Sequence, residues 1–373
     1  MALSLEAFTL GVEEEYQIIH PQTRQLRSRA KSVLANAQQT LGDQVTQELY
    51  LSQIEIGTSI CQTLQQVRLE LQVLRGQVIA AAQKSESRLV AAGTHPFSHW
   101  QDQQLTPTER YLGLESDFQQ LTREQLIFGC HIHVGIPDRE LAIQVMNRVR
   151  PWLGALLALA SNSPYWLGDD TGYASFRTEI WGRWPTAGIP QFFDSRADYD
   201  RLIEDLTAMG SIADASKIYW DVRPSSHFDT LEFRVTDVCL TIDEAVLVAG
   251  LVRALVLTCA LEAEANVALP TIRPEILQAV KWQAARYGLA QTLIDPLAGR
   301  AVAASSVIYQ FLSYVRSALE AYNDWDEVSS LVDQVIQGGT GSARQRAAYE
   351  RGGKLEDVVD LLVRETAIGA VLK

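Results

Sequence analysis

The feature that most constrains the fold is a two-residue alternation between apolar and charged side chains. It is clearest in residues 231–235, where Leu231, Phe233 and Val235 alternate with Glu232 and Arg234. Side chains two apart in a β-strand point to the same face. We therefore expect a strand whose apolar face lies on the core, while an acid and a base share the opposite face.

Two more segments repeat this arrangement. Glu13 and Glu15 are two apart in GVEEE, and His131 and His133 are two apart in GCHIH. Each pair therefore shares one face of its expected strand. Glu14 lies on the other face of the first strand, where a salt-bridged or edge acid is the ordinary explanation. The sequence thus predicts three strands that present polar side chains on one side.

Helical periodicity accompanies these strands, so α+β is the expected fold class. Apolar residues at three- and four-residue intervals predict a helix over about 64–78, capped by Thr58 or Ser59. No repeat or linker divides the chain. We therefore expect residues 1–373 to form a single domain, with a largely helical C-terminal part over about 243–373.

The net charge argues against two classes of partner. The chain has 32 Lys and Arg against 45 Asp and Glu, which gives a formal net charge of −13. Nucleic acids and anionic membranes are bound through cationic faces, so neither is an expected partner. A single anionic ligand is compatible with this charge if metal ions or a few arginines neutralise it locally.

The sequence favours a reducing, cytoplasmic location. The four cysteines include no CxxC pair and do not make a disulfide framework in a chain of this length. The N-terminus lacks the basic start and apolar run of a signal peptide. The most apolar stretch, about 245–260, is short for a membrane-spanning helix and carries Arg253 at its centre. Segment 244–263 fits either internal core or the interface of a homodimer, and core is the commoner case.

Each polar pair has an ordinary structural explanation as well as a chemical one. Taken alone, Glu13 and Glu15 are more often acids on a solvated strand edge. The two histidines suit a metal or a phosphate about as well as a hydrogen-bonded core position. Glu232 and Arg234, taken alone, could form no more than a surface ion pair.

Three such strands in one chain favour the chemical explanation. Carboxylates with one imidazole are a ligand set for Mg²⁺ or Mn²⁺, whereas structural zinc would draw on cysteine. Arginines beside such a metal suit the oxygens of a transferring phosphoryl group. The sequence contains no GxxxxGK[ST] motif, so a P-loop nucleotide site is not expected.

A glycine-rich segment at residues 338–342 lacks the lysine of a P-loop. We expect a turn there, before a helix that begins near Ala343, because glycine commonly marks loops. The alternative is a mobile flap over a substrate, with Arg344 and Arg346 contacting phosphate.

Together these segments resemble the carboxylate–amine ligases of the YbdK type, also called glutamate–cysteine ligase type 2, which are related to glutamine synthetase. Six segments carry the resemblance in the family's order and cover the chain nearly end to end: FTLGVEEEY, AAGTHPF, GCHIHVGIPD, SNSPYWLGDDTGYASFRTEIW, YWDVRPSSHFDTLEFRVTD and GGTGSARQR. The resemblance implies a glutamine-synthetase-like catalytic fold, in which a curved, mainly antiparallel sheet is backed by helices. The nucleotide and metals would lie on the concave face.

The resemblance also implies roles for individual residues. The implied metal ligands are Glu13, Glu15, Glu48, Glu55, His131 and Glu232. Relatives often have Asp at the position of Glu48. By the same resemblance His133 faces the nucleotide, and Arg223 and Arg234 bind phosphate. Arg177 resembles a contact for a substrate carboxylate or a phosphate.

The activity implied by the resemblance is ATP-dependent amide-bond formation with Mg²⁺ or Mn²⁺, through an acyl phosphate. Glutamate and cysteine are the implied substrates, giving γ-glutamylcysteine, ADP and phosphate, and in similar proteins this activity is weak. Three alternatives stay open: the same ligase chemistry on another amino acid or amine, a metal-dependent hydrolase that uses the same residues without ATP, and a non-catalytic nucleotide-binding protein. The full set of expected acids and arginines weighs against the last.

Overall fold

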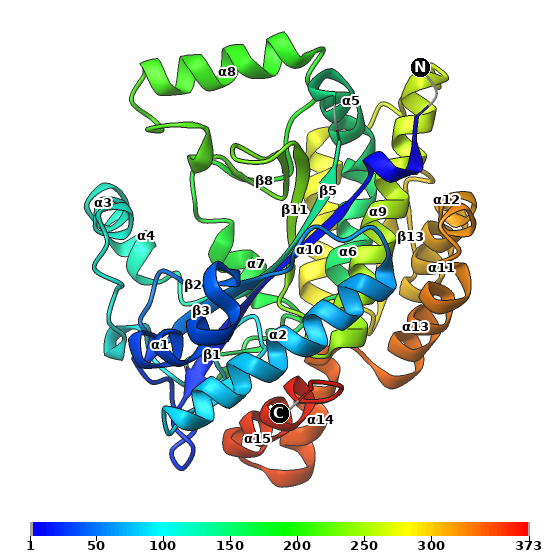
Figure 1. Ribbon diagram of the computed structural model, residues 1–373. Coiled ribbons are helices and arrows are strands. Elements are labelled where there is room, and N and C mark those ends of the chain that lie inside the picture. The colour runs from blue at the N-terminus through cyan, green and yellow to red at the C-terminus, as the bar shows by residue number, and fades with distance from the viewer. Residues whose placement is uncertain (1–2, 137, 372–373) are drawn as a thin grey trace.

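A seven-stranded antiparallel sheet lies at the centre of the protein (Figure 1). The computed structural model describes residues 3–136 and 138–371. The strands lie in the order β10-β11-β5-β1-β3-β2, and β4 also pairs with β1. Their bounds are β1 (Leu10–Ile19), β2 (Val45–Gln47), β3 (Gln53–Gly57), β4 (Arg88–Val90), β5 (Gly129–Gly135), β10 (Val222–Pro224) and β11 (Thr230–Asp237). Helices lie between these strands along the chain and follow the last of them. The expected α+β class is therefore confirmed.

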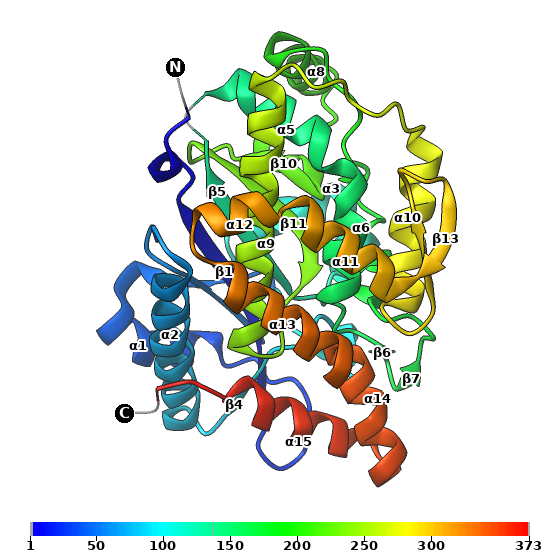
Figure 2. The same ribbon diagram turned by 90° about the vertical axis from the view of Figure 1, so that its right-hand side faces the viewer.

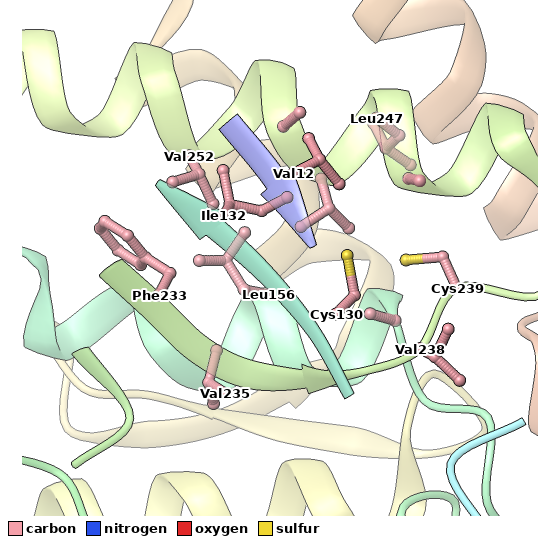
Figure 3. Packing of buried hydrophobic residues seen from close by; sticks show 14 of the residues in the cluster. Val12, Cys130, Ile132, Leu156, Phe233, Val235, Val238, Cys239, Leu247 and Val252 are labelled. Carbon is pink, nitrogen blue, oxygen red and sulfur yellow. The ribbon is translucent and has the colours of Figure 1, made fainter. Parts of the chain in front are cut away.

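The sheet has one apolar and one polar face because its strands alternate as the sequence predicts. In β1, Val12 is buried in the apolar cluster, whereas Glu13 points to the opposite face. Figure 3 shows Val12, Ile132 and Phe233 from three adjacent strands in that cluster, with Val252 of helix α9 (Ile242–Glu264) beside them. The apolar face is therefore the core, and the polar face is free to form a site.

Helix α9 covers the apolar face. It packs against β5 and against helices α2 (Leu64–Lys84), α5 (Arg139–Val149), α12 (Arg316–Ala321) and α13 (Trp325–Gly338) (Figure 2). With 23 residues, α9 is longer than the stretch of about 245–260, so the expectation that it is too short to span a membrane was wrong. Within α9, 89% of the most apolar 18-residue stretch is buried inside the protein, as in the core helix of a folded domain.

Helix α2 begins at Leu64, as predicted, but its cap is a different residue from the two that the sequence suggests. Its N-cap is Thr63, whose hydroxyl accepts a hydrogen bond from Gln66 N at 3.1 Å in a capping box. Thr58 and Ser59 do not cap the helix, because the chain there still runs beside β1, where Thr58 N donates to Val12 O at 2.9 Å. The predicted cap was therefore wrong, although the predicted helix is confirmed.

The remaining elements surround the sheet. The other helices are α1 (Ala30–Leu41), α3 (Glu109–Phe118), α4 (Gln120–Arg123), α6 (Leu153–Leu159), α7 (Phe176–Trp181), α8 (Arg196–Ala208), α10 (Pro274–Tyr287), α11 (Ala304–Tyr314), α14 (Gly341–Gly352) and α15 (Leu355–Thr366). Short strands form three small pairs: β6 (Tyr165–Trp166) with β7 (Asp169–Asp170), β8 (Ala187–Gly188) with β9 (Tyr219–Trp220), and β12 (Thr292–Asp295) with β13 (Arg300–Ala303). From α9 onward the described chain is helical apart from the β12–β13 hairpin, close to the expected pattern.

Glu14 and the cysteines lie in the core. Glu14 is completely buried on the apolar side of β1, where Arg75 Nε donates to its Oε2 at 3.0 Å. Of the two expected explanations, a salt-bridged acid or an edge acid, the first is confirmed. The four cysteines are buried and free, in agreement with the expected lack of a disulfide framework.

Candidate functional site

The polar face of the sheet gathers the acids and histidines that the sequence singles out. Strand register joins them in three cross-strand pairs: Glu13 with His131, Glu15 with Glu55, and Glu232 with His133. Residues opposite each other on one face have Cβ atoms about 5 Å apart. Segments far apart in the sequence therefore form one polar row that crosses β11, β5, β1 and β3.

The two histidines lie between the acids of β1. His131 Nδ1 lies 3.1 Å from Glu13 Oε2, and its Nε2 lies 3.9 Å from Glu15 Oε1. His133 Nε2 lies 3.3 Å from Glu13 Oε1, and its Nδ1 lies 2.9 Å from the hydroxyl oxygen of Thr230. Both Nε2 atoms are buried and neither makes a well-aligned hydrogen bond in the described chain, although His133 Nε2 stays within ion-pair distance of Glu13. Such atoms are uncommon in folded proteins, so these nitrogens are candidate ligand contacts.

Two groups in the row have the geometry to hold a cation. Glu13, His131 and Glu232 form one group, and Glu15, Glu55 and His131 form the other, with the ligand atoms of each group within 4.8 Å of one another. Burial, and then the charge of Arg234, lowers the pKa of His131 to about 4, so this imidazole is neutral near pH 7, as a metal ligand must be. Carboxylate oxygens with one imidazole suit Mg²⁺ or Mn²⁺.

The acids of the row carry charge that a cation would neutralise. Burial, and then repulsion from Glu48, raises the pKa of Glu15 to about 7. Burial, and then the charges of Glu13, Glu48 and Glu15, raises the pKa of Glu55 well above its usual range. Burial opposes the charge of Glu13, but its two histidine contacts outweigh burial and lower its pKa. A divalent cation among these groups would replace the repulsion by attraction.

Glu232 lies between two arginines. Arg223 Nε donates to Glu232 Oε2 at 2.8 Å, and Arg234 Nη1 donates to Oε1. Burial opposes the charge of Glu232, but the charges of Arg234 and then Arg223 hold its pKa well below the usual range. Each carboxylate oxygen has two lone pairs, so Glu232 can keep these bonds and still present an oxygen to a cation. The row therefore combines cation ligands with positive side chains.

Arg177, on α7, is a buried cation that makes no direct ion pair with a carboxylate among the described residues. Its side chain forms no ion pair among the described residues, its two hydrogen bonds to Arg234 O are long at 3.5 Å, and its Nε has no partner. Gly129 leaves room for it, because a Cβ at residue 129 would lie 2.3 Å from Arg177 Nη2. Gly129 N also donates to Glu15 Oε2 at 2.6 Å. An unpaired, desolvated guanidinium at this position suits an anionic ligand.

Glu48 lies just beyond the row, directly after β2. Its Oε2 accepts a hydrogen bond from Leu49 N at 2.6 Å and lies 3.3 Å from the Tyr111 hydroxyl. It belongs to neither of the two groups that could hold a cation, whereas Glu55 belongs to one. A metal-binding role for Glu48 therefore stays a prediction without that geometric support.

Sequence reasoning missed one wall of the site. A cavity of about 80 Å³ adjoins the row on the side of Glu15 and Arg234. Side chains that carry no sequence signal noted above line most of it: Arg110, Tyr111, Gln125, Trp181, Trp184 and Tyr219. The two tryptophans, three residues apart, were the available sequence signal, although α7 ends at Trp181 and Trp184 lies beyond it. The other residues come from separate segments that only the fold brings together.

The glycine-rich segment forms a turn before α14, as expected. Ser342 N donates to Ser161 O at 3.0 Å, which fixes the start of the helix to the chain after α6. Arg344 is ion-paired with Glu365 at 2.7 Å and also with a second acid, and Arg346 is ion-paired with Asp170 at 2.6 Å. Both arginines are therefore engaged by protein carboxylates, which gives the flap alternative no support.

Known proteins resemble this chain along nearly its whole length. A family model described as glutamate–cysteine ligase family 2 (GCS2) matches residues 9–361. A protein of Rhodopirellula baltica is 41% identical over 99% of this chain and 100% of its own length. A protein of Roseiflexus castenholzii is 40% identical over 97% of this chain and 95% of its own. Both relatives carry the name glutamate–cysteine ligase 2 as a provisional designation.

Two solved structures share the fold. The glutamate–cysteine ligase of Francisella tularensis, solved in complex with AMP, has a TM-score of 0.72 at 13% identity and covers 97% of this chain and 89% of its own. A bifunctional glutathione synthetase from Pasteurella multocida has a TM-score of 0.70 at 16% identity, over 98% of this chain and 52% of its own. The expected ligase fold, an antiparallel sheet backed by helices, is confirmed.

Proposed function

The chain belongs to glutamate–cysteine ligase family 2, and we propose that it is an ATP-dependent ligase that joins a carboxylate to an amine. One observation carries the proposal. Glu232 lies between Arg223 and Arg234, and its carboxylate is within 4.8 Å of ligand atoms of Glu13 and His131. Cation ligands and phosphate-binding charge thus meet at one point, as phosphoryl transfer requires.

The main obstacle to this reaction is charge. A substrate carboxylate attacks the γ-phosphorus of ATP, forming an acyl phosphate and releasing ADP, although both reactants are anionic. An amine then displaces phosphate to form the amide. Mg²⁺ or Mn²⁺, held by Glu13, Glu15, Glu55, His131 and Glu232, would neutralise phosphate charge.

Side chains of this chain supply the rest of the chemistry. Arg223 and Arg234 stabilise charge that develops on the phosphoryl oxygens, because both already lie beside Glu232 in a buried setting. Arg177, which lies beside the backbone of Arg234, orients an anionic group of a substrate. His133 faces the nucleotide, and it does not line the cavity.

Glutamate as carboxylate donor and cysteine as amine are the substrates we propose, with slow turnover. Support for this pair comes from the family to which the chain belongs and from the names of its relatives. Another amino acid or amine as the acceptor would require no change in the residues that handle phosphate.

The test measures ADP formation with ATP and Mg²⁺ against a panel of amino acids and amines. We expect ADP formation to require both a carboxylate and an amine. The variant Glu232→Gln should lose this ADP formation. Glu365→Gln is the matched control, because it also loses an arginine ion pair, at 2.7 Å, outside the site. Near-wild-type ATP consumption by Glu232→Gln, or release of phosphate without an amine, would refute the ligase assignment.

A further inference from the structure

Strand β11 ends in a buried carboxylate that the ligase chemistry above does not use. Asp237 has no exposed surface, and it lies opposite Gly129 of β5 in the register of the sheet. Its Oδ2 accepts hydrogen bonds from Asn162 N and from the Ser163 hydroxyl, and its Oδ1 accepts one from the Ser175 hydroxyl, each at 2.7 Å. A desolvated carboxylate with three donors fixes the position of the segments that supply them.

A β-bulge decides the direction in which this side chain points. Side chains alternate between the two faces of a strand, so Asp237 would share the apolar face with Phe233 if β11 were regular. Phe233 pairs with Ile132 and Thr236 pairs with Cys130, so over this span β11 has one residue more than β5. An extra residue moves every later side chain to the opposite face. Asp237 therefore points to the polar face, which carries the row.

The bulge also brings Asp237 close to Arg177. Gly129, which pairs with Asp237 in the register, faces the Arg177 guanidinium, because a Cβ at residue 129 would overlap Nη2 of that side chain. The guanidinium donates to the carbonyl oxygen of Arg234, a residue next to the bulge, at 3.5 Å. Burial lowers the pKa of Arg177, and the charge of Asp237 is the strongest influence that opposes burial. Asp237 thus supplies negative charge near a guanidinium that no carboxylate of the described chain contacts directly.

Hydrogen bonds join Asp237 to the backbone of α7 as well. The Ser163 hydroxyl, which donates to Asp237, accepts a hydrogen bond from Arg177 N at 3.0 Å. Ser175 is the N-cap residue of α7, a position whose hydroxyl usually accepts from a backbone N–H of the helix. Here it makes no such bond and donates to Asp237 instead. One carboxylate therefore holds both the chain before α7 and the first turn of the helix.

Four of the six segments that carry the family resemblance meet at this network. Asp237 ends the segment YWDVRPSSHFDTLEFRVTD, and Gly93 of AAGTHPF leaves room for its carboxylate, because a Cβ there would lie 2.7 Å from Asp237 Cγ. Asn162, near the start of SNSPYWLGDDTGYASFRTEIW, accepts through its Oδ1 from Nε2 of Gln345 in GGTGSARQR at 2.8 Å. The network therefore accounts for residues of these segments that have no place in the polar row.

We infer that Asp237 is a positioning residue for Arg177. Its carboxylate fixes the start of α7 through Ser163 and Ser175, and its charge stabilises the guanidinium from a distance. A direct ion pair would occupy the N–H donors that an anionic substrate group needs, whereas a buried cation without any nearby negative charge would be costly. The inference rests on the proposed function and deepens it, because it assigns the residue that places the substrate-binding arginine.

The first test is the steady-state kinetics of ADP formation by the full chain with ATP, Mg²⁺, glutamate and cysteine. Arg177→Gln identifies the substrate that this arginine contacts, because the KM for that substrate should rise about tenfold or more when a charged hydrogen bond is lost. Asp237→Asn removes the charge with little change of shape. It should raise the same KM about tenfold and leave the KM of each other substrate within about twofold of wild type.

The double variant shows whether Asp237 acts through Arg177. In the Arg177→Gln background, Asp237→Asn should change that KM less than about twofold further, because the group that it positions is already gone. Ser163→Ala, which removes the hydroxyl between Asp237 and Arg177 N, keeps the test open if Asp237→Asn does not fold. It should raise the same KM and no other.

The second test needs no turnover. Thermal unfolding in EDTA compares the effect of Asp237→Asn on Tm in wild type and in the Arg177→Gln background. Attraction between Asp237 and Arg177 is lost only in the wild-type background, so the change in Tm there should be less favourable by about 1 °C or more.

Thr236→Val is the matched control in both tests. Thr236 is the buried neighbour of Asp237 in β11, and its hydroxyl donates to Cys130 O at 2.8 Å. Loss of this hydrogen bond should lower Tm. It should not raise one KM selectively, and its effect on Tm should be the same with and without Arg177, as for a residue with a purely structural role.

Two results would overturn the inference. One is an Asp237→Asn variant that changes every KM equally or none of them. The other is additivity, in which the effects of Asp237→Asn and Arg177→Gln on KM multiply and their effects on Tm simply add. Failure of the ligase proposal looks different: no pair of substrates would produce ADP, while the difference in Tm between the two backgrounds would persist.

Discussion

Replacing Glu15 by glutamine should stabilise the metal-free protein above neutral pH. Burial, and then repulsion from Glu48, raises the pKa of Glu15 from 4.5 to about 7 in the folded protein. One pKa unit corresponds to about 1.36 kcal/mol, so ionised Glu15 lowers the free energy of unfolding by about 3 kcal/mol at pH 8. Glutamine retains an oxygen that can accept the hydrogen bond from Gly129 N, now at 2.6 Å, and carries no charge to bury.

The pH dependence of this effect has a definite sign. Because the pKa of Glu15 is raised by folding, the wild-type protein loses this stability as the pH rises from about 4.5 to about 7. The difference in free energy of unfolding between Glu15→Gln and wild type should grow over that window. It should vanish near pH 4, where Glu15 is mostly protonated in both the folded and the unfolded chain.

Thermal unfolding in EDTA, followed by circular dichroism at pH 5 and pH 8, measures the difference. An unfolding entropy of about 2.1 cal/mol/K per residue gives about 0.8 kcal/mol/K for 373 residues, so Tm at pH 8 should rise by about 4 °C. Glu14→Gln is the matched control from the opposite face of β1, and it should lower Tm because it breaks the buried ion pair with Arg75. A Glu15→Gln variant no more stable than wild type at pH 8 would refute the reasoning. Saturating Mg²⁺ should instead raise the Tm of the wild type more than that of Glu15→Gln.

Three further predictions test the site from other directions. Gly129→Ala places a Cβ 2.3 Å from Arg177 Nη2 and should reduce ATP turnover about tenfold or more, whereas Gly113→Ala, with no atom within 4 Å of the added Cβ, should not. Adding Mg²⁺ to the metal-free protein at pH 7 in weak buffer should release protons, because Glu15 and Glu55, whose pKa values are raised, must ionise to bind the cation. A pH indicator that shows no proton release would contradict the metal site. Arg346→Ala should lower the free energy of unfolding by less than about 1 kcal/mol and leave turnover intact, because Arg346 pairs with the half-exposed Asp170. A large loss of turnover would instead favour a flap over the substrate.

Local alternation made much of the sheet and its polar face predictable. Leu231 and Phe233 had to face a core if the segment was a strand, and this alone fixed the side on which Glu232 and Arg234 lie. Boundaries were less predictable, because the residues that end an element depend on what lies beside it. Thr58 has the chemistry of a helix cap, but its N–H is bound to Val12 O, so the cap is Thr63.

Partnerships between distant side chains could not be predicted in the same way. Arg344 and Arg346 follow a glycine-rich turn that resembles a phosphate loop, yet their partners, Glu365 and Asp170, come from a later helix and an earlier hairpin. Gln125 and Trp184 carry no motif, and their unpartnered atoms are visible only once the chain has closed around them. Desolvation and ion pairing depend on distance in space, which sequence separation does not give.

The sequence by itself determined which residues this protein places on a polar strand face, because a two-residue period is a property of the backbone. It also determined the family, through motifs that stand in order along nearly the whole chain. Only the tertiary structure decided the register that puts Glu13 opposite His131 and Glu15 opposite Glu55, and with it the pKa values of the row. The cavity beside Arg177 was likewise decided by the packing of segments that are remote in sequence, since burial and unsatisfied hydrogen bonds exist only in the folded chain.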